Sequence, residues 1–459
     1  MTDMFTVINP ATGRPLQQTP RASVAEVDRA VAAAVRAGAE WAARAPLERA
    51  NLLRTFAAAV EAHTQELAEL EVANSGHPIS SALWEAAHVA QVLHYSAGAP
   101  ERLIGQQIPV AGGLDVTFHE PYGVVGVIVP WNFPMTIAAW AFGPALAAGN
   151  AVVLKPAELT PLTAVRLGEI AREAGLPEGL FTVITGSGSV VGERFVTHPD
   201  VRKVVFTGST EVGISVAAGC ARALKPVTLE LGGKSANVVF ADADLERAAA
   251  AVPGSVFDNA GQDCCARSRI LVQRSVYDRF LELLEPAVAA WRVGDPADAA
   301  TDMGPLISAA HRDGVAEFLD GARLAFRGPE PTLTDQQRDG FWFAPAVVLA
   351  DPAERVAREE IFGPIVAVMP FEDESEAIRM ANDSIYGLAG SVWTENLGRG
   401  VRVARAVRSG VISVNSHASV RYSTPFGGMK ASGLGRELGP DAAEHFTETK
   451  NVFFATDAP

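Results

Sequence analysis

The sequence predicts an α/β protein made of two domains and a small β extension. At 459 residues the chain is longer than a single hydrophobic core usually supports. From Gly123 onward, short and fully apolar runs alternate with helical segments, a pattern typical of parallel strands that helices cover on both faces. A second series of such runs begins near Ser235, so we expect two α/β domains joined near Gly232.

Composition narrows the class of protein. The formal net charge of −15 argues against a nucleic-acid or anionic membrane surface, because such partners attract clustered positive charge. Three cysteines give no disulfide framework, and no Cys/His spacing matches a zinc site, so we expect no metal. The N-terminus lacks the pattern of a signal peptide, which together with the cysteine usage predicts a cytoplasmic protein.

The N-terminal hundred residues are predicted to be mainly helical. Ser23 and Glu26 form a capping box at the start of a helix that extends to about Ala45. A second helix is expected from Pro46 to the break at residues 74–78. Residues 107–120 alternate apolar and polar side chains around two glycines, which predicts a β-hairpin. The tail TKNVFFAT is predicted to be a strand that forms, with this hairpin, a sheet able to pair with another subunit.

Residues 121–154 contain no charged residue and no histidine, as a membrane span would. Four prolines interrupt the run, so we expect buried core elements instead. The apolar runs GVVGVIVP, NAVVLKPA, LFTVIT, KVVFTGS and VTLELGG predict the first sheet. The runs ANVVFAD, RILVQRS, PAVVLAD, PIVAVMPF and GVISVN predict the second. Between strands, residues 160–175 are expected to form a helix with a Thr160 cap, Pro161 in its first position and Gly175 just past its end.

Candidate nucleophiles stand in NAGQDCCARSR, where Cys264 and Cys265 are adjacent. A cysteine attacks as its thiolate and needs a base or a lowered pKa. The nine histidines are scattered outside any recognisable Cys/His protease context. Glu230 ends an apolar strand, where ligands bind in open α/β sheets, so it is either a general base or a solvated turn residue.

Other polar groups also follow strands. FTGSTEVG follows a strand and opens a helix, a geometry that holds pyrophosphate better than the weaker signal TGSGSVVG. Lys155 is the first of only six lysines and ends a strand, and Glu158 could accept hydrogen bonds from a ribose diol. The less favoured alternative is a surface lysine and glutamate in a loop. Asn132 lies between prolines in PWNFP, as an oxyanion donor or as a simple turn former.

Together these stretches resemble the aldehyde dehydrogenase superfamily. PWNFP, LKPAELTP, FTGSTEVG, LELGGKS, GQDCCA, EEIFGP and PFGGMKASGLGRELG stand in the order and spacing of that family, and the likeness covers nearly the whole chain. It implies two Rossmann-like α/β domains plus a β oligomerisation extension. Residues 1–98 and 122–232 would bind NAD, residues 233–428 would form the catalytic domain, and residues 99–121 and 429–459 would bridge subunits of a homodimer or homotetramer.

The resemblance also implies site residues. Cys264 would be the nucleophile, Asn132 and the Cys264 N–H the oxyanion hole, and Glu230 the general base. Lys155 and Glu158 would bind the adenine-side ribose. The full set expected to bind the cofactor is Val129, Pro130, Trp131, Lys155, Glu158, Gly188, Gly192, Phe206, Gly208, Ser209, Val212, Leu231, Glu360 and Phe362. By this likeness the chain oxidises an aldehyde to a carboxylic acid through a thiohemiacetal and a thioester on Cys264.

Finer preferences follow from single residues. Glu230 favours water over coenzyme A as acyl acceptor, and Glu158 favours NAD over NADP because a carboxylate repels a 2′-phosphate. The expected substrate pocket, Phe133, Trp140, Asp263, Cys265, Val420 and Phe426, suits an apolar or aromatic aldehyde. Arg421 would favour an ω-semialdehyde, Asp263 a cationic aminoaldehyde, and His311 is expected to be a surface helix residue. A catalytically silent binding relative is the remaining alternative.

Overall fold

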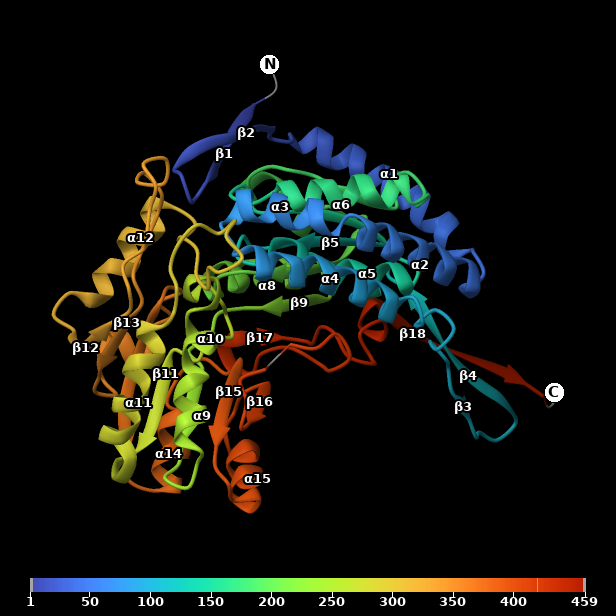
Figure 1. Cartoon of the computed structure of the whole chain (residues 1–459). Helices are drawn as coiled ribbons and strands as arrows, with labels where there is room; N and C mark the ends of the chain where they lie inside the picture. The colour runs from blue at the N-terminus through green and yellow to red at the C-terminus, as the bar shows by residue number, and fades with distance from the viewer. Residues whose placement is uncertain (1–2, 419, 457–459) are drawn as a thin grey trace.

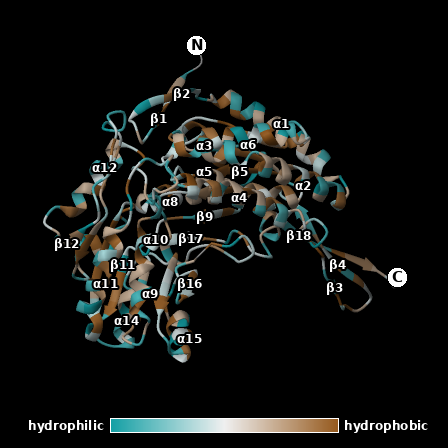
Figure 2. Ribbon diagram, in the orientation of Figure 1, coloured by the Kyte–Doolittle hydropathy of each residue, from teal (hydrophilic) through white to brown (hydrophobic). Residues whose placement is uncertain are grey.

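The computed structural model describes residues 3–418 and 420–456, in which two sheets carry most of the strands. One sheet and its helices form the upper body in Figure 1, the second sheet lies below it, and a narrow β extension projects to one side. In Figure 2 hydrophobic residues line the interior strands and continue onto the projecting strands of the extension. Within the described residues, no helix is both long and apolar enough to cross a membrane.

The first sheet has the order β17-β9-β8-β5-β6-β7. Its strands are β5 (Val124–Ile128), β6 (Ala151–Lys155), β7 (Phe181–Val183), β8 (Val201–Thr207), β9 (Val227–Glu230) and β17 (Gly433–Leu434). All neighbours are parallel except β17, which comes from far along the chain and pairs antiparallel with β9. Because helices cover both faces, β5 and β6 are buried at every position.

The second sheet has the order β12-β13-β14-β11-β10-β15-β16, and only the edge strand β12 is antiparallel. Its strands are β10 (Ala236–Val239), β11 (Arg269–Gln273), β12 (Arg323–Arg327), β13 (Ala346–Leu349), β14 (Ile365–Phe371), β15 (Ala389–Trp393) and β16 (Val411–Val414). Both sheets therefore confirm the expected parallel α/β architecture.

Helices of the first half are α1 (Val24–Ala42), α2 (Pro46–Ala62), α3 (Thr64–Ser75), α4 (Ile79–Ser96), α5 (Pro134–Ala147), α6 (Leu162–Glu173), α7 (Glu193–Thr197) and α8 (Thr210–Arg222). Those of the second half are α9 (Leu245–Ala250), α10 (Val252–Val256), α11 (Tyr277–Ala289), α12 (Ala309–Ala316), α13 (Arg355–Arg358), α14 (Glu374–Asn382) and α15 (Leu397–Ala406). Every residue of α5 is buried, so the uncharged run 121–154 belongs to the core as expected.

Several sequence predictions at the N-terminus were wrong in detail. The chain begins with an antiparallel pair, β1 (Met4–Asn9) and β2 (Arg14–Pro20), which the sequence analysis missed because β2 is almost wholly exposed and carries no apolar alternation. The expected second helix is two helices, α2 and α3, that meet at His63. The Ser23–Glu26 capping box is present, although α1 ends at Ala42. Pro161, not Thr160, caps α6.

The β extension consists of β3 (Gln107–Ile108), β4 (Gly113–Pro121) and β18 (Thr447–Ala455), in the order β18-β4-β3. It confirms both the predicted hairpin and the predicted tail strand, which pair over nine residue positions between β18 and β4. Large apolar side chains on it are half exposed: Leu114, Phe118, Phe453 and Phe454. The extension thus presents an unpaired strand edge with apolar side chains, at the side of the body seen in Figure 1.

Candidate active site

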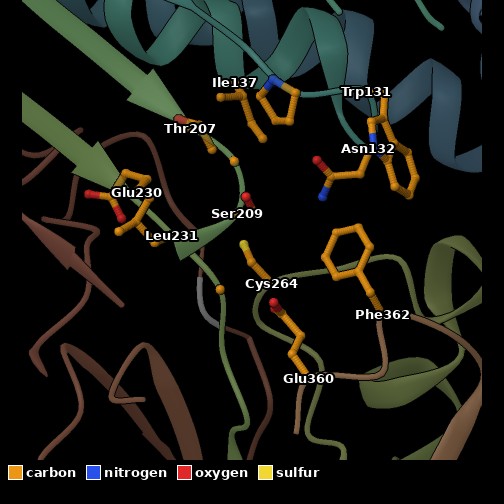
Figure 3. A pocket seen from close by; sticks show the side chains of 13 residues that line it. Trp131, Asn132, Ile137, Thr207, Ser209, Glu230, Leu231, Cys264, Glu360 and Phe362 are labelled. Atoms are coloured by element: carbon orange, nitrogen blue, oxygen red, sulfur yellow. The ribbon is translucent and has the colours of Figure 1, made fainter. Parts of the chain in front are cut away.

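A cavity of about 250 Å³ opens at the carboxyl ends of β8 and β9, facing the loop that carries Cys264. Figure 3 shows the Cys264 sulfur between Asn132 on one side and Glu230 on the other. Predicted residues that line it are Pro130, Trp131, Asn132, Gly208, Ser209, Glu230, Leu231, Cys264, Glu360 and Phe362. Ile137, Thr207 and Gly232 also line it and were not predicted. The fold therefore brings together three candidate reacting groups that are far apart in the sequence.

The loop before Cys264 is held in an unusual backbone conformation. Asn259 and Ala260 have left-handed φ angles of 48° and 54°, which side chains other than glycine seldom adopt. Asn259 Nδ2 donates to Asn132 O at 2.7 Å, and Gln262 Nε2 donates to Asn259 O at 3.0 Å. Gln262 Oε1 accepts a hydrogen bond from Ile307 N at 2.9 Å. Sequence analysis missed these two amides, although both stand in the NAGQDCC motif.

Asn132 lies in the turn between β5 and α5, with only 3% of its surface exposed. Its Nδ2 donates to Gln262 O at 3.0 Å, so the amide is tied to the cysteine loop. Asn259 Nδ2 in turn donates to the Asn132 carbonyl oxygen, so two hydrogen bonds fix the position of the turn relative to the cysteine loop. Such a fixed amide donor has the rigidity that oxyanion stabilisation requires.

Cys264 is half-buried, and its neighbour Cys265 is buried. A hydrogen bond with the Cys265 thiol, and then burial, raise the pKa of the Cys264 thiol well above its usual value. Asp263 binds the Cys265 N–H at 2.8 Å, and burial raises the pKa of its carboxyl. Within the described residues, these three side chains form the one group whose potential metal-binding atoms converge, all within 4.8 Å. A closed zinc site uses four ligands, so we assign no metal to it.

Glu230 ends β9 and is 3% exposed. Burial, followed by the nearby Glu437 carboxylate, raises its pKa well above the usual range. Gly427 lies against this carboxylate, since a Cβ at residue 427 would lie 2.6 Å from Glu230 Oε1. Glu437 is itself buried, and burial raises its pKa to about 8. Sequence analysis missed Glu437, although it lies within the quoted motif PFGGMKASGLGRELG.

Glu360 and Phe362 close the cavity beside Cys264. Gly233 N donates to Glu360 Oε1 at 2.8 Å, and burial raises the pKa of this carboxyl to about 7. The Phe362 ring packs edge-on against Trp131 with 5.2 Å between ring centres. His311 binds Phe362 O at 2.8 Å and packs on Trp131. The expectation that His311 is a surface residue was therefore wrong, because folding brings α12 against this loop.

The remaining cofactor candidates lie around a second hollow of about 490 Å³, which Gly188, Gly192, Phe206 and Val212 line. Phe206 precedes Thr207 of the first cavity, and Ser209 caps the N-terminus of α8 by accepting from Val212 N at 3.4 Å. Val129 is buried at the β5 end. Ser209 at the N-terminus of α8 lines the first cavity and Val212 of the same helix lines the second hollow, and a helix N-terminus favours an anionic ligand.

Lys155 is the last residue of β6, and Glu158 lies three residues further along the chain. Burial lowers the pKa of the Lys155 ammonium to about 8, and its Nζ donates to Pro156 O at 2.8 Å. Glu158 forms an ion pair with Arg21, with 2.6 Å between Nε and Oε1. Neither residue is among those that line the two hollows, and the sequence analysis did not foresee Arg21 as the partner of Glu158.

The six residues expected to form the substrate pocket lie outside the lining of the first cavity. Trp140 and Phe426 are buried and pack together with 5.0 Å between ring centres. Trp140 Nε1 donates to His88 Nε2 at 3.0 Å, so this His88 nitrogen is the unprotonated one. The Phe133 ring packs on His77 at 5.3 Å. Val420 is half-buried against the same core, while Arg421 is exposed.

Comparisons with known proteins agree with this arrangement. The model of the "Aldehyde dehydrogenase family" matches residues 1–452. A phenylacetaldehyde dehydrogenase of Pseudomonas fluorescens is 41% identical, over 98% of this chain and 92% of that protein. The NADP/NAD-dependent aldehyde dehydrogenase PuuC of Escherichia coli (strain K12) is 39% identical, over 99% of this chain and 93% of its own length. PnpE from Pseudomonas sp. WBC-3, in complex with nicotinamide adenine dinucleotide, superimposes with a TM-score of 0.97 at 40% identity, covering 100% of this chain and 95% of that one.

Proposed function

The chain belongs to the aldehyde dehydrogenase family, and we propose that it oxidises a medium-sized apolar or aromatic aldehyde to the carboxylic acid with NAD⁺ and water. The observation that carries this proposal is the convergence of Cys264, Asn132 and Glu230 on one cavity. The three side chains come from a loop, a strand-to-helix turn and a strand end, so their meeting is a property of the fold and not of a short motif.

In the proposed reaction the Cys264 thiol gives up its proton to solvent water, and its Sγ then forms a bond to the aldehyde carbon as the C=O π bond breaks. Asn132 Nδ2 and the Cys264 N–H then donate to the oxygen on which negative charge develops. Bound NAD⁺ supplies the hydride acceptor, and loss of hydride from the carbon leaves a thioester on Cys264. Glu230 removes a proton from water as the water oxygen attacks, the C–S bond breaks, and the acid leaves.

For the cofactor, we assign Lys155 and Glu158 to the adenine-side ribose, Gly208 and Ser209 to the pyrophosphate, and Glu360 and Phe362 to the nicotinamide end. The two adjoining hollows and the α8 N-terminus support this assignment. NAD is proposed as the preferred cofactor because Glu158 offers a carboxylate to a ribose diol. The NAD-bound relative PnpE and the NADP/NAD-dependent relative PuuC are consistent with a site for a nicotinamide dinucleotide.

For the substrate, the similarity to a phenylacetaldehyde dehydrogenase supports an apolar or aromatic aldehyde. The aminoaldehyde alternative depends on Asp263. That carboxylate already accepts the Cys265 N–H and is faced by the Arg267 charge, so it is a poor partner for a substrate ammonium. Arg421 is exposed, which weakens the semialdehyde alternative as well.

We test the function by NADH absorbance with a panel of aromatic, aliphatic, carboxylated and amino aldehydes. Cys264→Ala is expected to abolish turnover, whereas Cys265→Ala, a matched change one residue away, is expected to retain it. An inert wild-type protein would contradict the proposal, and so would activity that survives in Cys264→Ala.

We further propose the domain limits predicted from the sequence, a homodimer or homotetramer joined through the β extension, and a cytoplasmic location. The half-exposed Phe453 and Phe454 on the strand edge of β18 support subunit pairing there. The mass of the protein in solution tests this, and a monomer would contradict it.

A further inference from the structure

Lys234 is a buried lysine beside the candidate active site, and the proposed reaction assigns it no role. It follows two glycines in the segment LELGGKS, and only 1% of its surface is exposed. Its Nζ has no hydrogen-bond partner among the described residues. A buried ammonium of this kind costs free energy unless a nearby charge compensates it. Lys234 therefore depends on the acidic groups that lie around it.

The segment that leads into Lys234 lies between Glu360 and the nucleophile loop. Gly233 N donates to Glu360 Oε1 at 2.8 Å. A Cβ at Gly232 would overlap Glu360 Oε2, so the carboxylate rests directly on this backbone. On the other side, a Cβ at Gly233 would overlap Cys264 O. Figure 3 shows Glu360 and Cys264 together at the cavity, so Lys234 stands directly behind the groups that line it.

Hydrogen bonds from other elements fix the backbone of this segment. Arg269 Nε, at the start of β11, donates to Lys234 O at 2.8 Å. Ser432 Oγ donates to Gly232 O at 2.6 Å. Because the backbone is held on both sides, the N–H of the intervening glycine keeps its direction toward Glu360.

Two carboxylates face the Lys234 ammonium. Burial, followed by the Arg269 charge, lowers the pKa of Lys234 to about 7, and the charges of Glu360 and then Glu359 oppose this lowering. Glu359 is exposed and pairs with Arg355, with 2.8 Å between Oε2 and Nε. Glu360 is therefore the carboxylate that remains to compensate the Lys234 charge.

The influence is mutual. Burial raises the pKa of the Glu360 carboxyl to about 7, and the backbone N–H bonded to it, followed by the Lys234 charge, opposes this rise. The Asp263 carboxylate adds to the rise. The other titratable side chains that the Glu360 charge influences are those of Cys264 and Tyr386. Lys234 is thus the cation that favours the ionised form of Glu360.

We propose that Lys234 is a positioning residue, whose ammonium holds the Glu360 carboxylate on the Gly232 and Gly233 backbone as an acceptor for the nicotinamide-side ribose. The proposal rests on the assignment of Glu360 to the nicotinamide end of the cofactor. An ionised carboxylate accepts hydrogen bonds from a ribose diol more strongly than a protonated one does. Lys234 is buried behind the cavity lining, so it acts on the cofactor through Glu360.

Binding of two probes tests this without any aldehyde turnover. Titrations compare NADH, which carries the nicotinamide-side ribose, with 5′-ADP, which does not. At pH 7, Lys234→Met is expected to weaken NADH by about tenfold, as for one lost charge beside a carboxylate, and to change 5′-ADP by less than about twofold. In a Glu360→Gln background the same change should weaken NADH by less than about twofold, because the partner carboxylate is already gone. Lys450→Met removes an exposed ammonium from β18 and, as the matched control, should change neither probe.

The pH dependence of NADH binding separates this role from a structural one. Wild-type affinity should fall below a pH of about 7, as Glu360 takes up a proton, and also above it, as Lys234 loses one. Lys234→Arg stays charged throughout, so it should bind NADH as wild type does near pH 7 and lack the alkaline fall. In Lys234→Met the alkaline fall should also be absent. Its acidic fall should begin at higher pH, because no ammonium lowers the pKa of Glu360.

Each contrary result has its own meaning. If Lys234→Met binds NADH as wild type does, the role of Lys234 is wrong while the cofactor site stands. If NADH and 5′-ADP weaken equally, Lys234 only supports the fold, and the proposal is again overturned. If Glu360→Gln binds NADH normally, the assignment of Glu360 fails and this proposal with it, and if wild type binds neither probe, the proposed function fails as well. Should circular dichroism show that Lys234→Met is unfolded, Lys234→Arg decides, and an alkaline fall like that of wild type would exclude the role.

Discussion

At the scale of single residues, the candidate site depends on neighbouring residues. These neighbours fix the orientation of one site side chain and shift the pKa of another. Asn132 is one, because Asn259 and Gln262 hold its turn against the cysteine loop. Glu230 is another, because Glu437 shares its buried environment. The fold must therefore position these supporting residues as well as the residues that are proposed to react.

Replacing Asn132 by alanine should lower kcat by about 100-fold to 1,000-fold, the usual effect of losing one oxyanion donor. The donor acts on charge that develops during reaction, so the dissociation constant for NAD should change by less than about threefold. Steady-state kinetics and a cofactor titration measure the two effects separately. A normal kcat in Asn132→Ala would exclude the proposed oxyanion role.

Glu437→Gln tests the coupling between the two buried carboxyls. The Glu437 carboxylate raises the pKa of Glu230, after burial, so its removal should lower that pKa. A general base works when it is deprotonated, so activity rises as pH passes its pKa. The rising limb of the kcat against pH profile should therefore move to lower pH in Glu437→Gln. A limb that moves to higher pH would show that Glu437 assists proton removal instead of opposing it.

At the scale of elements, the segments that carry Asn132 and Cys264 are connected through a buried cluster defined by His77, Glu85, Glu71 and Asp258. His77 Nδ1 hydrogen bonds to Glu85, and Glu85 Oε2 accepts from Thr136 in α5 at 3.2 Å. Because Asp258 begins the loop that leads to Cys264, the cluster joins α3, α4 and α5 to the nucleophile segment.

The pKa of His77 makes this connection pH-dependent. Burial alone lowers it, but Glu85, with Glu71 and Asp258, outweighs burial and raises it to about 9. A raised histidine pKa stabilises the fold fully below the unfolded value of about 6.5, and this contribution is lost as pH rises through about 9. The free energy of unfolding of wild type should therefore exceed that of His77→Gln most at pH 6, with the gap closing by pH 9.5.

Urea unfolding across this pH range measures the gap. His94→Gln, which changes an exposed imidazole near the end of α4, is the matched control and should show little difference from wild type at any pH. A gap for His77→Gln that widens with pH would mean that His77 is neutral in the folded protein.

At the scale of the whole molecule, the β extension is an apolar surface built on an unpaired strand edge, away from the two sheets (Figure 1). Phe453 and Phe454 are half exposed in the single chain, and the proposed pairing of subunits would bury them. The double change Phe453→Glu and Phe454→Glu should therefore lower the mass in solution toward that of a monomer, because two carboxylates oppose burial.

Sedimentation or light scattering gives this mass, and circular dichroism confirms that the variant is folded. Leu397→Glu alters another exposed apolar side chain, on α15, and should leave the mass unchanged. An unchanged mass in the double variant would exclude the extension as the subunit interface.

The sequence by itself determined the class of fold, because apolar runs separated by helices have few other ways to bury themselves. It also predicted Cys264, Glu230 and Asn132 as site residues, and the fold brings these three to one cavity. It failed at β1 and β2, where exposed residues give no periodic signal, and at His311, whose burial depends on a helix docking from elsewhere. Local patterns carry information on strands and motifs, but not on which distant segments they meet.

Only the tertiary structure decided how these residues are held. It placed Glu437 beside Glu230, Arg21 on Glu158, and Asn259 across from Asn132, pairs that lie far apart along the chain. The physical reason is that a buried charge or amide is tolerated only where folding supplies a partner or a compensating environment, and that partner comes from whichever element packs there. The sequence determined which groups are candidates for reaction, and the packing of the two sheets, the helices and the connecting loops decided their neighbours.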